Sequence, residues 1–354
     1  MRVIVFGSNS ATSLGLVRCL KNFEITLLCD SQFNAVKYSK YVSKKIFYDK
    51  LDAQLCDLLI KYKELHGSFI FPSSDENLSF ILDHQSKLSG LFEITFSKFG
   101  SKILSKVFQK EYAHKSNLKV PRKIDVKSVH QTDLPVIIKP VDSLKYGKEY
   151  FSVIYNFTEY ELFLKNRKSE IDFFAEEFIE GETINMFELI GYFDHKKNIY
   201  GYFGINKKRQ FPPSIGSSSY IKTFNFPKEI IDSLFLFFSN LEYVGLFDAE
   251  FKFCSKRKAY FFIECNFRAG APISFTEINN FSLLNNYLKG ISSSYNSTTK
   301  LHWMNDQIDY VNIKHRLSLL TFIKDILTVN KFAFFDKKDL KPFYKMLSHK
   351  FFKC

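Results

Sequence analysis

The sequence lacks the cysteine patterns that mark a disulfide-stabilised or zinc-binding protein. Its six cysteines show no paired spacing and no CxxC motif: Cys19, Cys29, Cys56, Cys254, Cys265 and Cys354. Two of them lie inside predicted strands, where a free cysteine behaves as a small apolar residue. This usage suits a reducing compartment and argues against a disulfide framework or a zinc site.

Long apolar runs are also missing. No window of about 18 apolar residues exists, so the sequence predicts no membrane-spanning helix. The chain starts with a strand-like run instead of a charged region followed by an apolar core, so we expect no signal peptide and a cytoplasmic protein. Arginine-rich tracts, zinc-finger spacing and RNA-binding signatures are absent, and the lysines behind the net charge of +13 are spread over the whole chain. We therefore expect no nucleic-acid partner.

The amounts of apolar and charged residues are those of an ordinary globular protein. Hydrophobic residues make up 45% and charged residues 25% of the 354 residues. A chain of this length can hold two or three domains with a substantial buried core.

The most informative stretch is Gly245–Ala271. Two apolar, β-rich runs flank the charged connection Ser255–Lys258, a pattern that predicts a β-hairpin. Glu250 lies on the first strand and Glu264 on the second, and Asn266 leaves the second strand on the same face as Glu264. Two carboxylates and an amide oxygen on one side form a site for a hard cation such as Mg²⁺. Two amphipathic strands with ordinary solvated acids are the alternative.

Arg268 completes a Glu-x-Asn-x-Arg ending on the second strand, where a guanidinium would suit a magnesium-bound phosphate. This ending, after a paired strand with an earlier Glu, resembles the metal-binding end of the ATP-grasp ligases. It is most similar to the carbamoyl-phosphate-synthase-like branch of carboxylate–amine ligases. The resemblance covers roughly residues 2–345 and rests on the order of several motifs.

The resemblance implies a mixed α/β and α+β fold in three parts. A Rossmann-like pre-ATP-grasp domain would occupy residues 1–100, and the two-lobed ATP-grasp domain residues 101–290. Within the latter, the small lobe would span about 120–185 and the large lobe about 186–290. A helical C-terminal segment, residues 291–354, would pack on the core.

The N-terminal pattern agrees with a Rossmann-like domain. Arg2–Gly7, a helical stretch at Leu14–Asn22 and Glu24–Asp30 form a β-loop-α-β unit, which predicts parallel strands. The loop lacks GxGxxG, so it is a weak candidate for a pyrophosphate site. Helix capping by Ser10 or Thr12 and anion binding at the helix N-terminus both remain open.

Two lysines match positions that bind nucleotide phosphates in the family. Lys139 lies in the apolar strand pattern Leu134–Pro140, where a lysine is costly unless it faces an anion. A lysine that protects a sheet edge is the alternative. Lys106 belongs to a helix predicted over Lys102–Lys115, at the family's spacing before Pro121. The resemblance implies that both lysines contact the phosphates of ATP.

Residues 173–186 resemble the adenine hinge of the same family. The residues implied to meet the nucleoside are Glu176, Glu177, Phe178, Ile179 and, at the ribose, Glu182. The family's glycine-rich loop over the phosphates corresponds to residues 141–150, which contain only Gly147. This departure leaves open how that loop closes.

The polar stretch 207–220 is predicted to form a loop between strands. Relatives carry a basic residue and a Gly-Ser-Ser segment near the acceptor site. The resemblance therefore implies substrate contacts by Arg209 and by Ser217, Ser218 and Ser219, with a flexible loop as the alternative.

Together these motifs imply an ATP- and Mg²⁺-dependent ligase. Two Mg²⁺ ions, or Mn²⁺, would be held by Glu250, Glu264 and Asn266, while Lys139 and Lys106 would neutralise the remaining phosphate charge. A substrate carboxylate would become an acyl phosphate, and an amine such as an amino acid would then form an amide. Arg268 would stabilise the oxyanion. The absence of any Ser–His or Cys–His arrangement fits such a reaction.

The substrates and the setting stay open. Synthesis of cell-surface polysaccharide or peptidoglycan precursors is one expectation, and a homodimer is another. A thiol or bicarbonate acceptor is an alternative chemistry. A nucleotide-binding relative without ligase turnover and a basic peripheral membrane or polyanion-binding protein are alternative functions.

Overall fold

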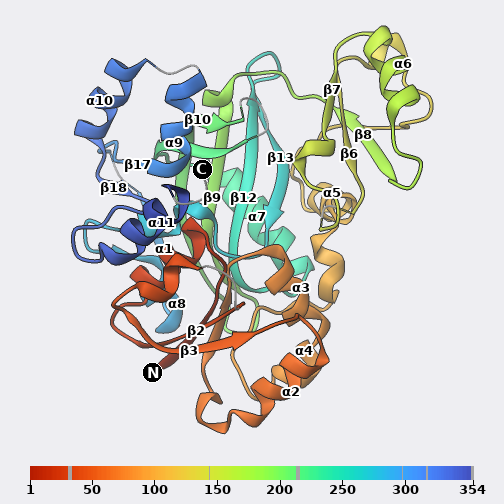
Figure 1. The fold of residues 1–354 in the computed structure, drawn as a ribbon. Helices are drawn as coiled ribbons and strands as arrows, with labels where there is room; N and C mark the ends of the chain where they lie inside the picture. The colour runs from red at the N-terminus through yellow and green to blue at the C-terminus, as the bar shows by residue number, and fades with distance from the viewer. Residues whose placement is uncertain (31–33, 143, 213–215, 297, 316–317, 352–354) are drawn as a thin grey trace.

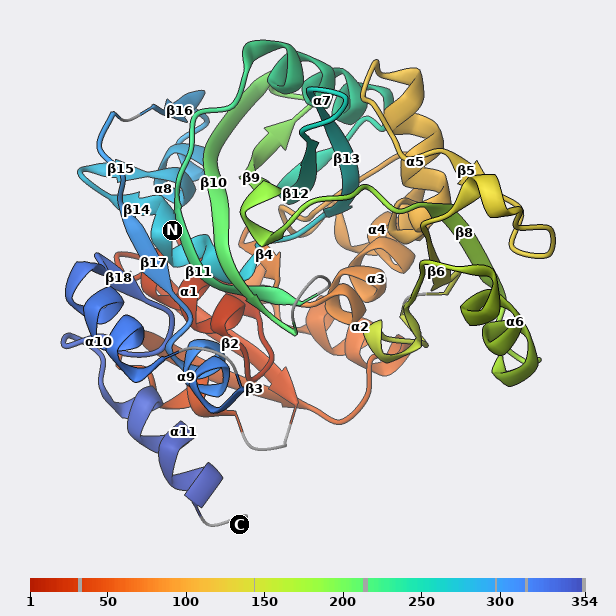
Figure 2. The same cartoon turned by 90° about the horizontal axis from the view of Figure 1, so that it is seen from above.

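The structure is a computed structural model that describes residues 1–30, 34–142, 144–212, 216–296, 298–315 and 318–351. An N-terminal parallel sheet, a small antiparallel lobe and a large, mostly antiparallel sheet follow one another along the chain (Figure 1). The mixed α/β class predicted from the sequence is confirmed. Seen from above, the small lobe lies on one side of the large sheet, and the C-terminal helices lie beside the N-terminal domain (Figure 2).

The N-terminal domain is a four-stranded parallel sheet in the order β3-β2-β1-β4. Its strands are β1 (Arg2–Phe6), β2 (Glu24–Asp30), β3 (Val42–Tyr48) and β4 (Phe69–Pro72), and its helices are α1 (Ala11–Cys19), α2 (Ala53–Lys61), α3 (Asp75–Asp83) and α4 (Gln85–Leu88). Helix α1 begins before the predicted Leu14, because the Ser10 hydroxyl accepts a hydrogen bond from the Ser13 N–H and caps the helix there.

Helix α1 also joins the N-terminal domain to the large lobe. It packs against a 3₁₀ helix, Ala271–Thr276, that follows the predicted hairpin. A Cβ atom at Gly15 would lie 2.7 Å from Cγ2 of Ile273, so only glycine allows this approach. Apolar residues of both units form one continuous core, which fixes the N-terminal domain against the large lobe.

The small lobe is a four-stranded antiparallel sheet in the order β5-β8-β6-β7. Helix α5 (Lys106–Lys115) leads into strands β5 (Lys123–Ile124), β6 (Val136–Pro140), β7 (Ser152–Ile154) and β8 (Phe173–Glu177), with helix α6 (Phe157–Asn166) between the last two. Val136 and Ile138 point into the lobe's own apolar core. Because side chains alternate along a strand, Lys139 faces away from that core.

The large sheet runs in the order β13-β12-β9-β10-β11-β17-β18, with β16 paired to β10. Its strands are β9 (Met186–Asp194), β10 (Ile199–Phe211), β11 (Ser217–Thr223), β12 (Val244–Cys254), β13 (Ala259–Asn266), β16 (Ser293–Tyr295), β17 (His302–Met304) and β18 (Lys331–Phe332). Helix α7 (Lys228–Asn240) buries Leu234, Phe237 and Phe238 against it. Strands β14 (Glu277–Ile278) and β15 (Phe281–Ser282) and helix α8 (Leu283–Leu288) follow the hairpin.

The predicted hairpin is confirmed, whereas the predicted loop at 207–220 is wrong. Strands β12 and β13 pair antiparallel around Ser255–Lys258, with Glu250 opposite Glu264. Residues 207–211 end β10 and residues 217–220 begin β11, and the two strands pair with each other. Several polar side chains of this stretch are buried in the sheet, which hides the strand pattern in the sequence. Residues 213–215 lie outside the described residues.

The C-terminal segment contains helices α9 (Asp306–His315), α10 (Leu319–Thr328) and α11 (Lys341–Phe351). Arg18 of α1 donates to the carboxylate of Asp339 at 3.2 Å and to the carbonyls of Ala333 and Phe334. Helix α10 turns part of its apolar face outward, because Leu320 and Leu327 are each 81% exposed. None of the described helices is both long and apolar enough to cross a bilayer.

The buried ion pair between Arg18 and Asp339 provides a test of this docking. We expect Arg18→Met to lower the free energy of unfolding by about 3–5 kcal/mol, because Asp339 would keep a buried charge without its partner. Chemical denaturation measures this change. Lys98→Met, which breaks the exposed pair with Glu242, is the control and should have little effect. Equal effects of the two substitutions would contradict the assignment.

Candidate functional site

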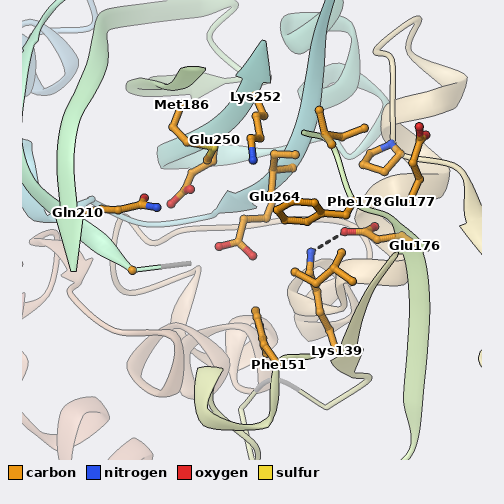
Figure 3. Close-up of a pocket in the computed structure, with 15 residues that line it drawn as sticks. Lys139, Phe151, Glu176, Glu177, Phe178, Met186, Gln210, Glu250, Lys252 and Glu264 are labelled. Carbon is orange, nitrogen blue, oxygen red and sulfur yellow. Dashed lines mark hydrogen bonds and ion pairs between the residues drawn. The ribbon is translucent and has the colours of Figure 1, made fainter. Parts of the chain in front are cut away.

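Two adjoining cavities lie between the small lobe and the large sheet. The first has an empty volume of about 630 Å³ and the second about 980 Å³. Phe151, Glu250 and Glu264 line both cavities, so the predicted carboxylate pair stands at their common boundary. Figure 3 shows the first cavity, with Lys139 and Glu176 facing these carboxylates.

A row of three glutamates crosses the large sheet at this boundary. Glu188 on β9 lies opposite Glu250 on β12, which lies opposite Glu264 on β13. Like charges opposite each other destabilise a sheet unless a cation compensates them. The Lys207 ammonium lies 2.8 Å from Glu188 and 3.0 Å from Glu250, and the Lys106 ammonium lies 2.7 Å from Glu264. Burial would lower the pKa of Lys207, but its two glutamates raise it instead.

Asp248 adds a further carboxyl group beside this row. It is buried, and burial together with the charges of Glu188 and Glu250 raises the pKa of Asp248 well above its usual value. A Cβ atom at Gly270 would lie 2.1 Å from Oδ2 of Asp248, so glycine is required there. Among the described residues, Oδ1 of Asp248 and Oε2 of Glu188 are buried without a hydrogen-bond partner.

These groups fit a hard cation. Glu250, Glu264 and Asn266 all line the second cavity, and their oxygens are the donors that Mg²⁺ prefers. Three His, Cys, Asp or Glu side chains arranged to bind a metal are not found in the described part of the chain. The predicted ligands Glu250, Glu264 and Asn266 are two carboxylates and one amide, so they would not form a group of that kind. The unpaired oxygens of Glu188 and Asp248 supply acceptor capacity beside it.

Lys139 lies in the first cavity and is only 5% exposed. Its ammonium lies 2.5 Å from Oε1 of Glu176, and the Lys110 ammonium lies 3.4 Å from Oε2 of the same carboxylate. Burial would raise the pKa of Glu176, but the two lysines outweigh it and lower that pKa. Burial lowers the pKa of Lys110 to about 8. Of the two lysines, Lys139 lines the first cavity, whereas Lys110 lines neither cavity.

The predicted hinge residues Glu176, Glu177, Phe178 and Ile179 also line the first cavity. Glu177 forms an ion pair with Arg257 at 2.8 Å, and the Phe178 N–H donates to the Pro135 carbonyl. Glu182 is exposed at the start of a 3₁₀ turn and lines neither cavity, so its contact with a ribose stays a prediction.

The glycine-poor loop reaches the second cavity. Tyr146 and Gly147 line it, and Phe151 places its ring 4.9 Å from the Lys106 ammonium and 5.9 Å from that of Lys139. Aromatic side chains of the loop and of the residue that follows it therefore form part of the lining of the second cavity. Residue 143 lies outside the described residues.

Arg268, Ser217 and Ser218 line the second cavity, and their predicted roles toward a substrate stay predictions. Arg268 donates to Asp75 at the start of α3, at 2.7 Å, so the N-terminal domain supplies one wall. The Ser218 hydroxyl donates to Glu188 at 2.8 Å.

Arg209, also predicted to contact substrate, is placed elsewhere. Its guanidinium binds Asp309 and Asp325 of the C-terminal helices and stacks on Tyr220. Ser219 likewise donates to Asp309, at 2.8 Å. These residues attach α9 and α10 to the large sheet, and Arg209 lines neither cavity. The substrate role predicted for Arg209 is therefore not supported, because its guanidinium binds the C-terminal helices and lines neither cavity.

Several polar residues of the site escaped the sequence analysis: Glu188, Lys207, Gln210, Asp248 and Lys252. Lys252 is only 6% exposed, its ammonium lies 4.6 Å from the ring centre of Phe178, and burial lowers its pKa to about 8. A signal was present, because Asp248, Glu250 and Lys252 alternate along an apolar strand and so share one face.

Comparison with known proteins shows the fold. No protein-family model matches the chain, and no curated protein matches it in sequence. Among solved structures, N5-carboxyaminoimidazole ribonucleotide synthetase from Thermus thermophilus is 14% identical with a TM-score of 0.61, over 82% of this chain and 78% of that one. The Staphylococcus aureus N5-carboxyaminoimidazole synthetase complexed with ADP is 14% identical, with a TM-score of 0.65 over 89% and 86%.

An L-amino acid ligase from Bacillus licheniformis is similar as well. It is 16% identical with a TM-score of 0.59, over 82% of this chain and 74% of that one. At such low identity the likeness concerns the arrangement of the backbone. The chain therefore has the fold of the ATP-grasp ligases, as its motifs implied.

Proposed function

We propose that this protein is an ATP- and Mg²⁺-dependent ligase that activates a carboxylate as an acyl phosphate and couples it to an amine. The observation that carries the proposal is the shared boundary of the two cavities. A mostly apolar cavity and a polar cavity meet at Glu250 and Glu264, with Lys139 and Lys106 facing them. Phosphoryl transfer between two bound molecules needs such an arrangement, with reactants on either side of a charged junction.

The first cavity would hold the nucleoside of ATP. Phe178 and Ile179 offer apolar contacts for a base, and Lys139 lines the same cavity as Glu250 and Glu264. The triphosphate would then extend past Lys139 toward Lys106. Both lysines are paired with glutamates in this structure, so nucleotide phosphates would compete with Glu176 and Glu264 for their ammonium groups.

Glu250, Glu264 and Asn266 would hold Mg²⁺ at the junction. When bound, the ion would neutralise phosphate charge as it shifts during transfer. Lys207 keeps Glu250 and Glu188 together and so orients Glu250 toward the cavity. The presence of two ions, or of Mn²⁺, stays a prediction.

The second cavity would hold the carboxylate and the amine. Arg268 is fixed by Asp75 at the edge of this cavity, and its guanidinium can bind the carboxylate or the oxyanion formed when the amine attacks. Ser217 and Ser218 line the same cavity. In this cavity Arg268 suits a carboxylate, and the neighbouring acidic groups suit an amine. This combination favours a ligase that forms a carbon–nitrogen bond. The L-amino acid ligase among the similar structures supports the same choice.

A role in building cell-surface polysaccharide or peptidoglycan precursors, a cytoplasmic location, a homodimer and the absence of a nucleic-acid partner stay predictions.

The proposal is tested by Mg²⁺-dependent release of ADP from ATP in the presence of pooled amino acids and uronic acids. We expect the pools to stimulate release, and Glu264→Gln to reduce it by roughly 100-fold, because one ligand of the ion loses its charge. Glu242→Gln, an exposed acid far from the cavities, is the control and should retain the wild-type rate. Absence of ATP binding in the wild-type protein would refute the proposal.

A second test separates Lys139 from Lys110, which share the carboxylate of Glu176. We expect Lys139→Met to weaken binding of Mg²⁺-ATP by roughly 10- to 100-fold, because a charge-assisted hydrogen bond to phosphate is lost. Lys110→Met should bind ATP nearly as well as the wild type, because Lys110 lies outside both cavities. Calorimetric titration gives both affinities, and equal losses would show that the lysines act only through Glu176.

A further inference from the structure

Two hydrogen-bond donors in the first cavity lack the partners that its other polar groups have. Lys252 on β12 and Gln210 on β10 are each only 6% exposed. In the described part of the chain, Nε2 of Gln210 has no hydrogen-bond partner, and no carboxylate forms an ion pair with Lys252. Both side chains line the first cavity, and Figure 3 shows them reaching into it from the large sheet.

The neighbouring charges are already compensated. Lys139 is paired with Glu176, and Glu177 with Arg257. The first cavity is also lined by several apolar residues: Ile137, Phe178, Ile179, Met186 and Ile263. Two unpaired donors therefore face an apolar slot, and a buried donor costs stability unless a ligand satisfies it.

Their position in the slot indicates what they would meet. Lys252 lies two residues beyond Glu250 on the same face of β12, which corresponds to roughly 7 Å along the strand. Its ammonium lies 4.6 Å from the ring centre of Phe178, a residue of the segment that would meet the base of ATP. A group in this part of the slot would be the flat, heteroaromatic end of a nucleotide.

We infer that Lys252 and Gln210 recognise the base of the nucleotide by donating hydrogen bonds to its ring-nitrogen or carbonyl acceptors. This inference rests on the proposed function and adds base selectivity to it. A base that offers acceptors toward β10 and β12 satisfies both donors. A base that presents a donor or a C–H there leaves them buried and unpaired, and such a mismatch discriminates strongly between ligands.

The test compares nucleotide binding by wild-type protein, Lys252→Met and Gln210→Leu. Titration calorimetry would measure Mg²⁺ complexes of ATP, GTP, ITP, CTP and UTP, and then deaza analogues of the preferred nucleotide. We expect the wild type to prefer one base by at least about 10-fold, and Lys252→Met to lose about that factor for this base alone. One deaza substitution that weakens binding to the wild type should have no effect on Lys252→Met.

The melting temperature of Lys252→Met distinguishes a binding role of Lys252 from a structural one. Methionine fills the same slot without a buried charge, so Lys252→Met should melt at the same temperature as the wild type or higher. Lys196→Met, which removes an exposed lysine of the turn after β9, is the matched control and should leave the ranking of bases unchanged. If Lys252→Met does not fold, Gln210→Leu carries the same test from the neighbouring strand.

The outcomes distinguish this inference from the proposed function. Tight binding of nucleotides with the same ranking in wild type, Lys252→Met and Gln210→Leu would overturn base recognition and leave the ligase proposal standing. Failure of the wild-type protein to bind any of the five nucleotides would overturn both.

Discussion

The site depends on how the protein compensates a row of glutamates that cross three neighbouring strands. Glu188, Glu250 and Glu264 lie opposite one another in the large sheet, where repulsion and loss of hydration would both oppose folding. Lys207 neutralises one end of the row from within the sheet, and Lys106 neutralises the other end from helix α5. Lys207 is buried and bound on two sides, whereas Lys106 borders the cavity. Lys207 therefore holds Glu188 and Glu250 in place, whereas Glu264, at the other end of the row, could exchange the ammonium of Lys106 for another cation.

The contacts that the sequence predicts correctly are local. The hairpin of β12 and β13 follows from alternation around a short charged turn, and its register alone brings Glu250 opposite Glu264. Lys139 is recognisable because a lysine among branched apolar residues must face an anion. Lys207 could not be assigned in this way, since its partner Glu188 lies on another strand and its neighbours are polar. The same polar neighbours make a strand resemble a loop, and Arg209 in that stretch serves the C-terminal helices instead of the cavity.

The second cavity shows why the N-terminal domain is part of the site. Asp75 holds the guanidinium of Arg268, and its position follows from the packing of α1 against the 3₁₀ helix that begins at Ala271. Gly15 allows that packing, although the cavity that it affects is lined in part by residues more than two hundred positions later, such as Arg268. No local pattern connects these residues. The fold class could be predicted from the order of the motifs. The wall of the second cavity could not, because it depends on how the domains are placed relative to each other.

The net charge of the whole chain and the charge of the second cavity have opposite signs, and this difference matters for the alternative that the protein binds polyanions. The chain carries a net charge of +13, yet the second cavity is lined by five carboxyl groups and only two cationic side chains. Burial and the charges of Glu188 and Glu250 raise the pKa of one of these carboxyl groups, Asp248, which lowers its tendency to ionise. A bare polyphosphate that entered from the first cavity would meet this negative field at short range, where the protein screens it poorly. A divalent cation at Glu250 and Glu264 would offset most of this excess of negative charge. The net positive charge of the chain can attract anions from a distance, and within the proposed function a triphosphate would enter this cavity more favourably together with a metal ion than alone.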